Sequence, residues 1–429
     1  MNRILRFLTL IVLTISLIGC GPEKLTQNQN KNQIELNVWH QWTNDNNQLK
    51  AIYDQAVKNY MDRNPQIKIN TKTLSTEAYK TKIAAEFTGE AKNIDIFYYW
   101  GAGTAEKFIT ADKLLPLDKY ISDESLADIL PGSLDAFTFS DRIYALPSFS
   151  WVMSLYVNTE LFEKAEVQLP STYSELTDAC QKLLELEKII PIAIGAKDGW
   201  DSAFIYQALA MKEVGAENIK QMLDNKKEFG DDPGYLLVAK KVRDLVEMGA
   251  FGNNPLENDY DTANMLFMQG QAAMRITGSW FVNQVYTDSN SMIKPEKIAV
   301  LDIPAIKEED SNTEYIGGFI ESFWVNKNTQ YKAEAAKFAI YISKQMGISS
   351  YETGTGFSAW RIEMDESKLN PLFIEVKNLL DKYEKGILAW DTVFPASIAS
   401  KSNEKIQELF GSEVDPGKFI EEMKEIINK

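Results

Sequence analysis

The sequence contains a single histidine and only two cysteines among its 429 residues. One histidine (His40) excludes a metal site built from several histidines, and it leaves one candidate base for a Ser-His-Asp triad. The cysteines, Cys20 and Cys180, are too few for a disulfide framework or for a Cys-x-x-Cys zinc or redox motif. Basic residues are also scarce, since 45 Lys and Arg oppose 61 Asp and Glu. This excess of acid argues against nucleic acid or an anionic membrane face as a partner.

Motifs that bind nucleotides or build common catalytic sites are missing as well. The sequence has no P-loop, no Gly-x-Gly-x-x-Gly after a strand pattern, no EF-hand loop and no Gly-x-Ser-x-Gly. We therefore predict no cofactor and no nucleotide. With 45% hydrophobic and 25% charged residues, the composition is that of an ordinary globular protein. At about 150 residues per domain, the length predicts two or three domains.

The first residues have the pattern of an export signal. A basic start precedes an apolar run over residues 7–18, which is too short to remain as a membrane-spanning helix. The run ends in Leu17-Ile18-Gly19-Cys20, which resembles the bacterial lipobox. That resemblance implies a signal peptide over 1–19 and lipid attachment to Cys20, and the polar stretch up to residue 33 is expected to be a flexible tether. The alternative is an ordinary signal peptide with a chance cysteine.

The rest of the chain alternates between strand and helix patterns. Strand patterns over 34–39, 67–73 and 94–99 enclose helical spacing over 49–61 and 79–87. This βαβαβ order predicts a mostly parallel sheet that is covered on both faces. Further strands are predicted over 189–194, 272–276, 298–303 and 319–325, and further helices over 173–187, 201–212, 235–248, 332–342 and from about 371 onward. The whole pattern predicts an α/β protein with two units of comparable size.

Tryptophan is abundant, with nine residues, and several lie at the ends of predicted elements beside Gly, Ser or Asp. These are Trp100, Trp151, Trp200, Trp280 and Trp360. In an open parallel sheet, the loops at the carboxyl ends of the strands gather around a crevice. An indole offers a flat apolar face and one N–H donor, which complement the C–H face and hydroxyl groups of a sugar ring. We interpret this set as a sugar-binding platform, the alternative for each ring being core packing.

Short motifs follow one another along the chain in the order found in one family. They are Val38-Trp39-His40-Gln41-Trp42, Asn64–Ile69, Asp95–Trp100, Leu114–Asp118, Ile143–Pro147 with Leu155–Phe162, Leu169–Leu176, Phe267–Met274, Gly278-Ser279-Trp280, Gly317-Gly318 and Ala335–Phe338. Over residues 34 to about 428 the sequence thus resembles the family-1 extracellular solute-binding proteins of sugar-importing ABC transporters, the group that includes the maltodextrin-binding proteins. One departure is Val157 before Asn158, where the family commonly has a tyrosine.

The resemblance implies two α/β lobes, in a periplasmic-binding-protein-like fold, that close on a ligand in the cleft between them. Lobe 1 would comprise 34–145 plus 311–350, and lobe 2 would comprise 146–310 plus 351–429, with a hinge near 147–150. The implied ligand-binding residues are His40, Trp42, Asn44, Asp45, Trp100, Trp151, Asp198, Trp200, Trp280, Glu321, Trp360 and Arg361.

The resemblance also implies a function without catalysis. The protein would be a monomer that captures an oligosaccharide and delivers it to the membrane permease of an ABC importer. It would be exported and anchored through Cys20 to the outer face of the bacterial cytoplasmic membrane.

Other functions stay open on the sequence alone. The same kind of receptor could take uronate-containing disaccharides, with Arg275 and Arg361 as cationic partners, or polyamines, which would use acids and aromatic rings. Ferric-ion and glycerol-phosphate receptors share the two-lobe plan. An exported glycoside hydrolase would also use tryptophans and paired carboxylates. Neither the sugar's identity nor a structural calcium ion follows from the sequence.

Overall fold

The computed structural model describes residues 33–307, 313–411 and 414–428. The predicted signal peptide (1–19), the lipidation site Cys20 and nearly all of the predicted tether lie outside these ranges. Residues 34–429 form one unit, and the description below concerns this unit alone. Within the three described ranges, no helix combines the length and the apolar character needed to cross a membrane.

The first sheet has four strands in the order β11-β3-β1-β2. Its members are β1 (Ile34–His40), β2 (Ile67–Thr73), β3 (Ile96–Trp100) and β11 (Glu321–Val325). Strand β1 pairs in parallel with both β2 and β3, whereas β11 runs antiparallel to β3. The carboxyl ends of β1, β2 and β3 therefore meet at one edge of the sheet, beside the first residue of β11.

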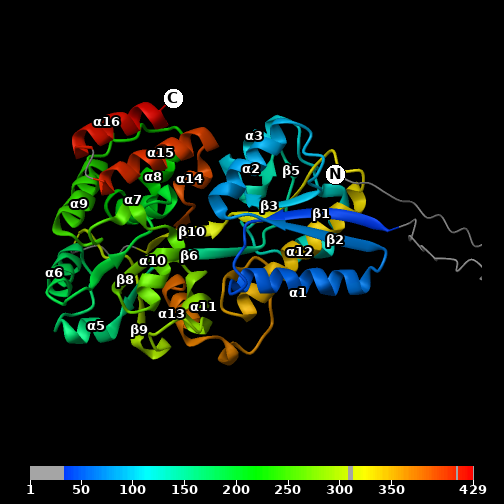
Figure 1. Ribbon diagram of the computed structural model, residues 1–429. Helices are drawn as coiled ribbons and strands as arrows, with labels where there is room; N and C mark the ends of the chain where they lie inside the picture. Colours follow the sequence, from blue (N-terminus) through cyan, green and yellow to red (C-terminus); the bar gives the residue numbers. More distant parts are fainter. Residues whose placement is uncertain (1–32, 308–312, 412–413, 429) are drawn as a thin grey trace, which may run out of the picture. The chain divides into compact units, whose positions relative to one another are not determined.

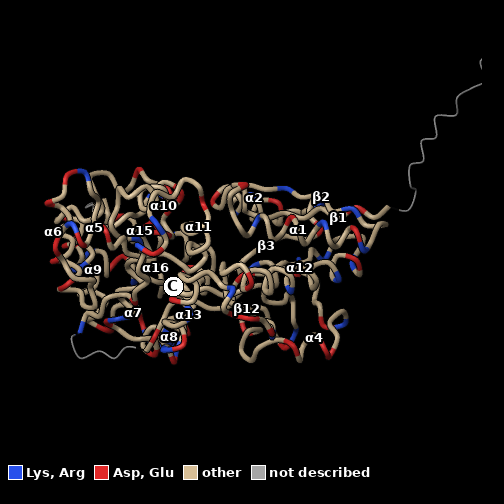
Figure 2. The backbone as a smooth tube through the Cα atoms, turned by 90° about the horizontal axis from the view of Figure 1, so that it is seen from below, with Lys and Arg blue, Asp and Glu red and all other residues tan. Residues whose placement is uncertain are grey.

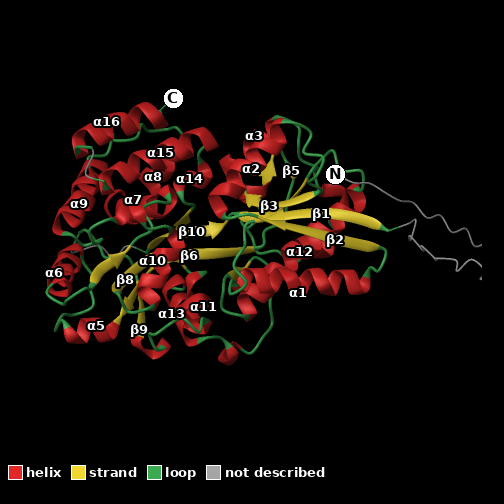
Figure 3. Ribbon diagram, viewed as in Figure 1, coloured by secondary structure: helices red, strands yellow, loops and turns green. Residues whose placement is uncertain are grey.

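Helices cover both faces of this sheet (Figures 1 and 3). They are α1 (Gln48–Arg63), α2 (Thr76–Thr88), α3 (Ala102–Thr110) and α12 (Lys332–Glu352), and the short α4 (Asp123–Ala127) and the hairpin β4 (Thr138–Phe139) and β5 (Arg142–Ile143) lie in the connections. Alternate residues of the strands enter two separate cores, as the pleat requires. Val38, Tyr98 and Phe323 pack with α1 and α12, whereas Phe97 and Trp324 pack with α2 and α3.

The second sheet is built around the long strand β6 (Phe149–Asn158), in which all ten residues are buried. Its other strands are β7 (Ile190–Ala193), β8 (Ala272–Gly278), β9 (Ile298–Leu301), β10 (Glu314–Phe319), β12 (Phe357–Ser358) and β13 (Lys385–Ile387). Strand β6 is antiparallel to β8, β9, β10 and β12. Only the pairs β7–β8 and β10–β13 are parallel, so this sheet is mixed.

Helices also surround the second sheet (Figure 3). They are α5 (Thr159–Lys164), α6 (Tyr173–Leu184), α7 (Gly199–Val214), α8 (Ala216–Leu223), α9 (Gly234–Met248), α10 (Tyr260–Met268), α11 (Phe281–Thr287), α13 (Pro371–Leu380), α14 (Trp390–Val393), α15 (Ala396–Phe410) and α16 (Pro416–Ile427). Helix α7 is buried along most of its length, because β6, α9 and α15 surround it. Helix α6 begins with a capping box, in which Thr172 and Glu175 bond each other's backbone amides.

The chain passes between the two sheets through short segments. Strand β10 ends at Phe319 and β11 begins at Glu321, so the single residue Ile320 separates these two strands of different sheets. Residues 147–148 run beside this link, where Pro147 bridges to Ser322 and the Ser148 amide donates to the Glu321 carbonyl. Gly317 lies against β6, and a Cβ there would be 2.0 Å from the Trp151 carbonyl oxygen. Only glycine fits this close approach.

Most predicted elements are confirmed, and the differences concern the second half of the chain. The expectation of mostly parallel pairing holds for β1, β2 and β3 but is wrong for the sheet around β6. The predicted strand over 319–325 corresponds to β11, and its first residue, Phe319, is instead the last residue of β10 in the other sheet. The segment from 371 onward is not helical throughout, because β13 adds a parallel strand to β10.

Candidate functional site

A cavity of about 610 Å³ lies where the strand ends of the two sheets meet. Residues that follow β1, β2 and β3 line it on one side, together with Glu321 at the start of β11. Residues that follow β7 and β8, the first residues of β6, and parts of α14 and α15 line it on the other side. Its volume is within the range of roughly 300–1,000 Å³ typical of small-molecule sites.

Five aromatic rings form one wall of this cavity, and all of them come from the second sheet and its helices. The Trp151 ring lies edge-on to the Trp280 ring, with centroids 4.9 Å apart, and stacks on Phe204 at 5.6 Å. Trp200 contacts both Phe204, at 5.2 Å, and Tyr260, at 4.9 Å. The rings therefore fix one another's orientation.

The local sequence explains how Trp280 reaches this wall. The ring folds back over Gly278, where a Cβ would lie 2.2 Å from it, so the preceding strand must end in glycine. The indole N–H then donates to the Tyr260 hydroxyl at 2.6 Å. Below Tyr260 lies the guanidinium of Arg275, which forms a fully buried ion pair with Asp201 at 2.8 Å.

The first sheet contributes a second aromatic and polar group. Trp42 is 4% exposed and packs against the rings of Tyr98, at 4.5 Å, and His40, at 4.8 Å. Glu321 pairs with Trp100 in antiparallel register, so the two side chains lie on the same face of the sheet. Burial raises the pKa of Glu321 to about 8, although a hydrogen bond from the Trp100 side chain opposes the shift.

Several polar atoms of lining residues are buried without any hydrogen-bond partner among the described residues. They are Gln41 Oε1, Trp151 Nε1, Trp200 Nε1, Glu321 Oε2 and Asp391 Oδ1. Buried polar groups are nearly always hydrogen-bonded, and each one left unpaired destabilises the fold by about 1–3 kcal/mol. These five polar atoms, on residues that line one cavity, are available to a bound polar molecule.

Carboxylates outnumber cations among the lining residues. Six acids line the cavity (Glu77, Asp198, Asp261, Glu321, Asp391 and Glu404) with three lysines (Lys80, Lys107 and Lys197). Burial raises the pKa of Asp198 and of Asp391, and the charge of Glu77 adds to both shifts. Over the whole described chain, by contrast, acidic and basic residues are interspersed (Figure 2). Within the described ranges, no group of three or more His, Cys, Asp or Glu side chains could hold a metal ion.

The structure brings eight of the twelve predicted site residues to this cavity. They are Trp42, Asn44, Trp100, Trp151, Asp198, Trp200, Trp280 and Glu321. His40, Asp45, Trp360 and Arg361 are not among its lining residues.

Each of these four residues has other contacts. His40 is fully buried, burial lowers its pKa to about 3, and its Nδ1 accepts from the Trp42 amide, so it supports the Trp42 loop. Asp45 is exposed and paired with Lys50 at 3.2 Å. Trp360 is 1% exposed, because β12 carries it against β6, where its indole donates to the Pro147 carbonyl at 3.0 Å. Arg361 is exposed and is held by backbone carbonyl groups of the 127–128 segment.

Several lining residues lie outside the predicted set, because little in the local sequence singles them out. Glu77 and Lys80 belong to the exposed face of α2, and a charged helical face ordinarily signals only solvent contact. Tyr260 follows a capping aspartate, and Asp391 is the second residue of the short α14, after the buried Trp390. Gln41 is the exception, since it lies between two predicted residues, His40 and Trp42.

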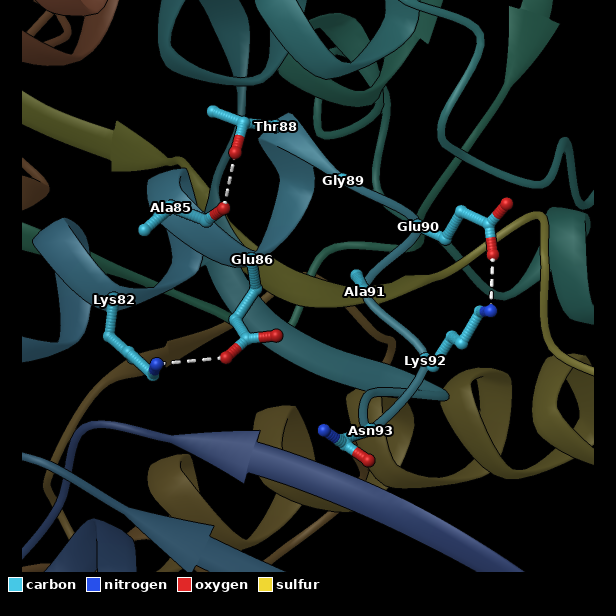
Figure 4. Close-up of a pocket in the computed structure, with 9 residues that line it drawn as sticks. All are labelled: Lys82, Ala85, Glu86, Thr88, Gly89, Glu90, Ala91, Lys92 and Asn93. Carbon is cyan, nitrogen blue, oxygen red and sulfur yellow. Dashed lines mark hydrogen bonds and ion pairs between the residues drawn. The ribbon is translucent and has the colours of Figure 1, made fainter.

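A second depression lies at the end of α2 and in the loop to β3 (Figure 4). Its charged side chains already pair with one another, since Lys82 contacts Glu86 and Lys92 contacts Glu90, both at 2.9 Å. The Thr88 hydroxyl donates to the Ala85 carbonyl. No aromatic side chain is among its lining residues, all of which are described. Nothing there matches the ring wall and unpaired polar atoms of the first cavity.

The fold and this cavity define a two-lobe binding protein with the ligand site between its two sheets. The sequence model described as "Bacterial extracellular solute-binding protein" matches residues 44–345, and the chain belongs to this family.

Individual relatives agree with this assignment. An uncharacterized ABC transporter extracellular-binding protein of Pyrococcus horikoshii is 22% identical, with 80% of this chain and 79% of that protein covered. The multiple sugar-binding protein of Streptococcus mutans is 20% identical, with 84% and 82% covered. A solved structure from a study of xylan utilization by the thermophilic bacterium Caldanaerobius polysaccharolyticus is 32% identical, with 91% and 99% covered and a TM-score of 0.86.

Proposed function

We propose that this protein is the substrate-binding component of a carbohydrate ABC importer, and that it captures a neutral oligosaccharide in the cavity between the two sheets. The observation that carries the proposal is the combination of indole faces with five unpaired polar atoms. The apolar C–H face of a sugar ring packs on the indole faces, and its hydroxyl groups can donate to and accept from the unpaired polar atoms.

Capture would proceed by closure of the two lobes around the sugar. We propose a hinge at Ile320 and residues 147–148. The predicted bound of 311 for the second part of lobe 1 then moves to 321, because β10 pairs with β6 and belongs to the second lobe. A sugar that touches Trp100 and Glu321 on one lobe and Trp200 and Trp280 on the other interacts most strongly with the closed form. That difference in affinity is what drives closure and lets the permease distinguish loaded from empty protein.

The charges of the cavity favour a neutral sugar over an acidic one. Of the two arginines considered as partners for uronates, Arg275 is fully buried in its pair with Asp201, and Arg361 does not line the cavity. The carboxylates of Glu77, Asp198 and Asp391 would repel an anion. The same carboxylates support a cationic polyamine as the second candidate ligand.

Export and anchoring complete the proposal. The family is extracellular, and the lipobox-like Leu17-Ile18-Gly19-Cys20 supports a lipid anchor on Cys20 that keeps the monomeric protein near its permease. We propose capture and delivery without catalysis.

A ligand screen on the full-length protein in detergent tests the proposal. Xylo-, malto- and chito-oligosaccharides, a uronate-containing disaccharide and spermidine are added in turn while the melting temperature and tryptophan emission are recorded. A ligand at 100 times its Kd stabilises the folded form by about 2.7 kcal/mol. We expect stabilisation by a neutral oligosaccharide, which mass spectrometry then recovers intact.

The other outcomes contradict specific parts of the proposal. Stabilisation by spermidine alone would make the protein a polyamine receptor, and stabilisation by the uronate alone would overturn the neutral-sugar assignment. Cleavage of the sugar would identify a hydrolase. No response to any compound would refute a carbohydrate function.

A further inference from the structure

Glu321 is a buried carboxyl group at the point where the two sheets meet. We propose that Glu321 binds the ligand as a neutral carboxylic acid, whose Oε2 hydroxyl donates a hydrogen bond to a ligand oxygen while the Trp100 indole holds Oε1. Trp100 would then act as a positioning residue as well as an apolar surface. The inference rests on the proposed function, because it assumes an uncharged, oxygen-rich ligand.

The hydrogen bonds of the carboxyl group assign different roles to its two oxygens. Glu321 is 7% exposed and lines the cavity, and Oε2 has no partner among the described residues. Trp100 lies opposite Glu321 in the antiparallel register, and its indole N–H and the backbone amide of Glu321 are the groups that favour the ionised carboxyl. An indole N–H can only donate, so the oxygen that it meets must accept. Since Oε2 is unpaired, we assign these donors to Oε1, which leaves Oε2 to carry the proton.

The aromatic and imidazole groups around β11 supply no charge. Tyr98 on β3 and Tyr53 on α1 have pKa values raised by burial, so both stay un-ionised. Tyr99, on the opposite face of β3, has its pKa raised by burial as well. At the end of β1, burial lowers the pKa of His40 to about 3, so the imidazole is neutral.

The nearby lysines do not pair with Glu321 either. Lys344 on α12 binds Asp128 at 2.7 Å. The amine of Lys80 on α2 lies 5.0 Å from the centre of the Trp100 ring, and that of Lys107 on α3 lies over the Tyr99 and Phe108 rings. No ion pair joins Glu321 to any cation in the described part of the chain, and no charged neighbour contributes to its shift.

A carboxylate buried without a cation is costly, so the group keeps its proton instead. The direction of the pKa shift, to about 8, agrees with this geometry. At pH 7 the acid outnumbers the carboxylate about tenfold. A neutral sugar brings no positive charge and displaces water, so its arrival favours the acid further.

The proposal therefore predicts that affinity depends on pH in one direction. If only the acid form of Glu321 binds, Kd is constant below pH 7 and is about tenfold larger at pH 9. At pH 9 the protein would also take up nearly one proton per ligand bound, and at pH 6 none. A carboxylate that accepted from sugar hydroxyls would show the reverse, with proton release and loss of affinity at low pH.

Isothermal titration calorimetry of the full-length protein in detergent tests the inference, with xylotriose as the probe and maltotriose where xylotriose gives no heat. Kd is measured from pH 6 to pH 9, in pairs of buffers with different ionisation enthalpies so that proton uptake is counted. Glu321→Gln replaces the acid by an amide that also has one donor and one acceptor. We expect this variant to bind within about threefold of wild type at pH 7 and to lose the pH dependence.

Further variants separate this role from a structural one. Trp100→Phe keeps the ring but removes the N–H, and we expect it to weaken binding and to move the pH at which affinity changes. Tyr98→Phe and Lys80→Met remove two other titratable groups that line the cavity, and both should keep the transition near pH 8. A pH-independent Kd in wild type, proton release, or a transition that persists in Glu321→Gln would overturn the inference and leave the proposed function intact. No heat with either trisaccharide at any pH would count against the proposed function, and the inference would fall with it.

Discussion

The buried carboxyl of Glu321 should make the unliganded protein less stable as the pH rises from 5 to 8. Its ordinary pKa is 4.5, and burial raises it to about 8 in the folded protein. Between these values the unfolded chain loses the proton while the folded protein keeps it, so each pH unit destabilises the fold by about 1.4 kcal/mol. At pH 7, which is 2.5 units above the ordinary value, the accumulated cost is about 3 kcal/mol.

Replacing Glu321 by glutamine removes this dependence, because the amide does not titrate. With an unfolding entropy of about 0.8 kcal/mol per kelvin for a domain of roughly 400 residues, 3 kcal/mol corresponds to about 3–4 °C. We expect the melting temperature of Glu321→Gln, relative to wild type, to rise by about 3 °C between pH 5 and pH 7. Differential scanning calorimetry without ligand measures it, and Glu77→Gln, which removes an exposed carboxyl from the same cavity, is the matched control.

The dependence on pH of the difference in melting temperature between Glu321→Gln and wild type is more diagnostic than the size of that difference at one pH. A constant offset between Glu321→Gln and wild type from pH 5 to pH 8 would mean that Glu321 ionises normally in the folded protein. An equal slope in Glu77→Gln would assign the pH dependence to the cavity as a whole. Either result would refute the reasoning from burial.

Three further predictions follow from the contacts of buried residues. Trp280→Ala removes one wall of the cavity, and we expect ligand affinity to fall by about 2 kcal/mol in calorimetric titration. Trp324→Phe, deep in the first sheet, is the control, and it should lower the melting temperature while Kd stays unchanged. An equal loss of affinity in both variants would contradict the assignment of Trp280 to the ligand site. Arg275→Met leaves Asp201 buried without its partner and should destabilise the fold by about 3–5 kcal/mol in urea unfolding. Adding Asp201→Asn should restore part of this loss, and no recovery would show that the pair is not the cause. Burial raises the pKa of the Cys180 thiol to about 12, so a thiol reagent at pH 8 should label the Cys180 peptide only after unfolding, as mass spectrometry would show.

Local patterns in the sequence were sufficient to predict elements in which buried and exposed residues alternate with the period of a strand or a helix. Alternation over 34–39 predicted β1, because Leu36 and Val38 are buried whereas Glu35 is exposed and Asn37 is half-buried. Helical spacing after it predicted α1, which buries one face and leaves the other to solvent. Strand β6 has no such alternation, since helices and strands bury all ten of its residues. The division of 314–325 into β10 and β11 is equally invisible, because both pieces are strands and only their partners differ.

For the candidate site, residue type and position at element ends were enough to select Trp100, Trp151, Trp200 and Trp280, all of which line the cavity. The same signal also selected Trp360, which packs in the interior near the hinge. An indole beside a polar residue looks the same in both settings. The sequence contains no information on which neighbour a ring will meet.

The sequence alone determined the family, the order of most elements and the set of aromatic residues available for a ligand. These depend on residues close together along the chain, or on motifs whose order is preserved. Only the tertiary structure decided which side chains share a cavity, which polar atoms remain unpaired there, and that Glu321 is buried beside Trp100 without a cation. Those properties depend on contacts between segments hundreds of residues apart, and desolvation acts on a carboxyl group only once such contacts have excluded water from it.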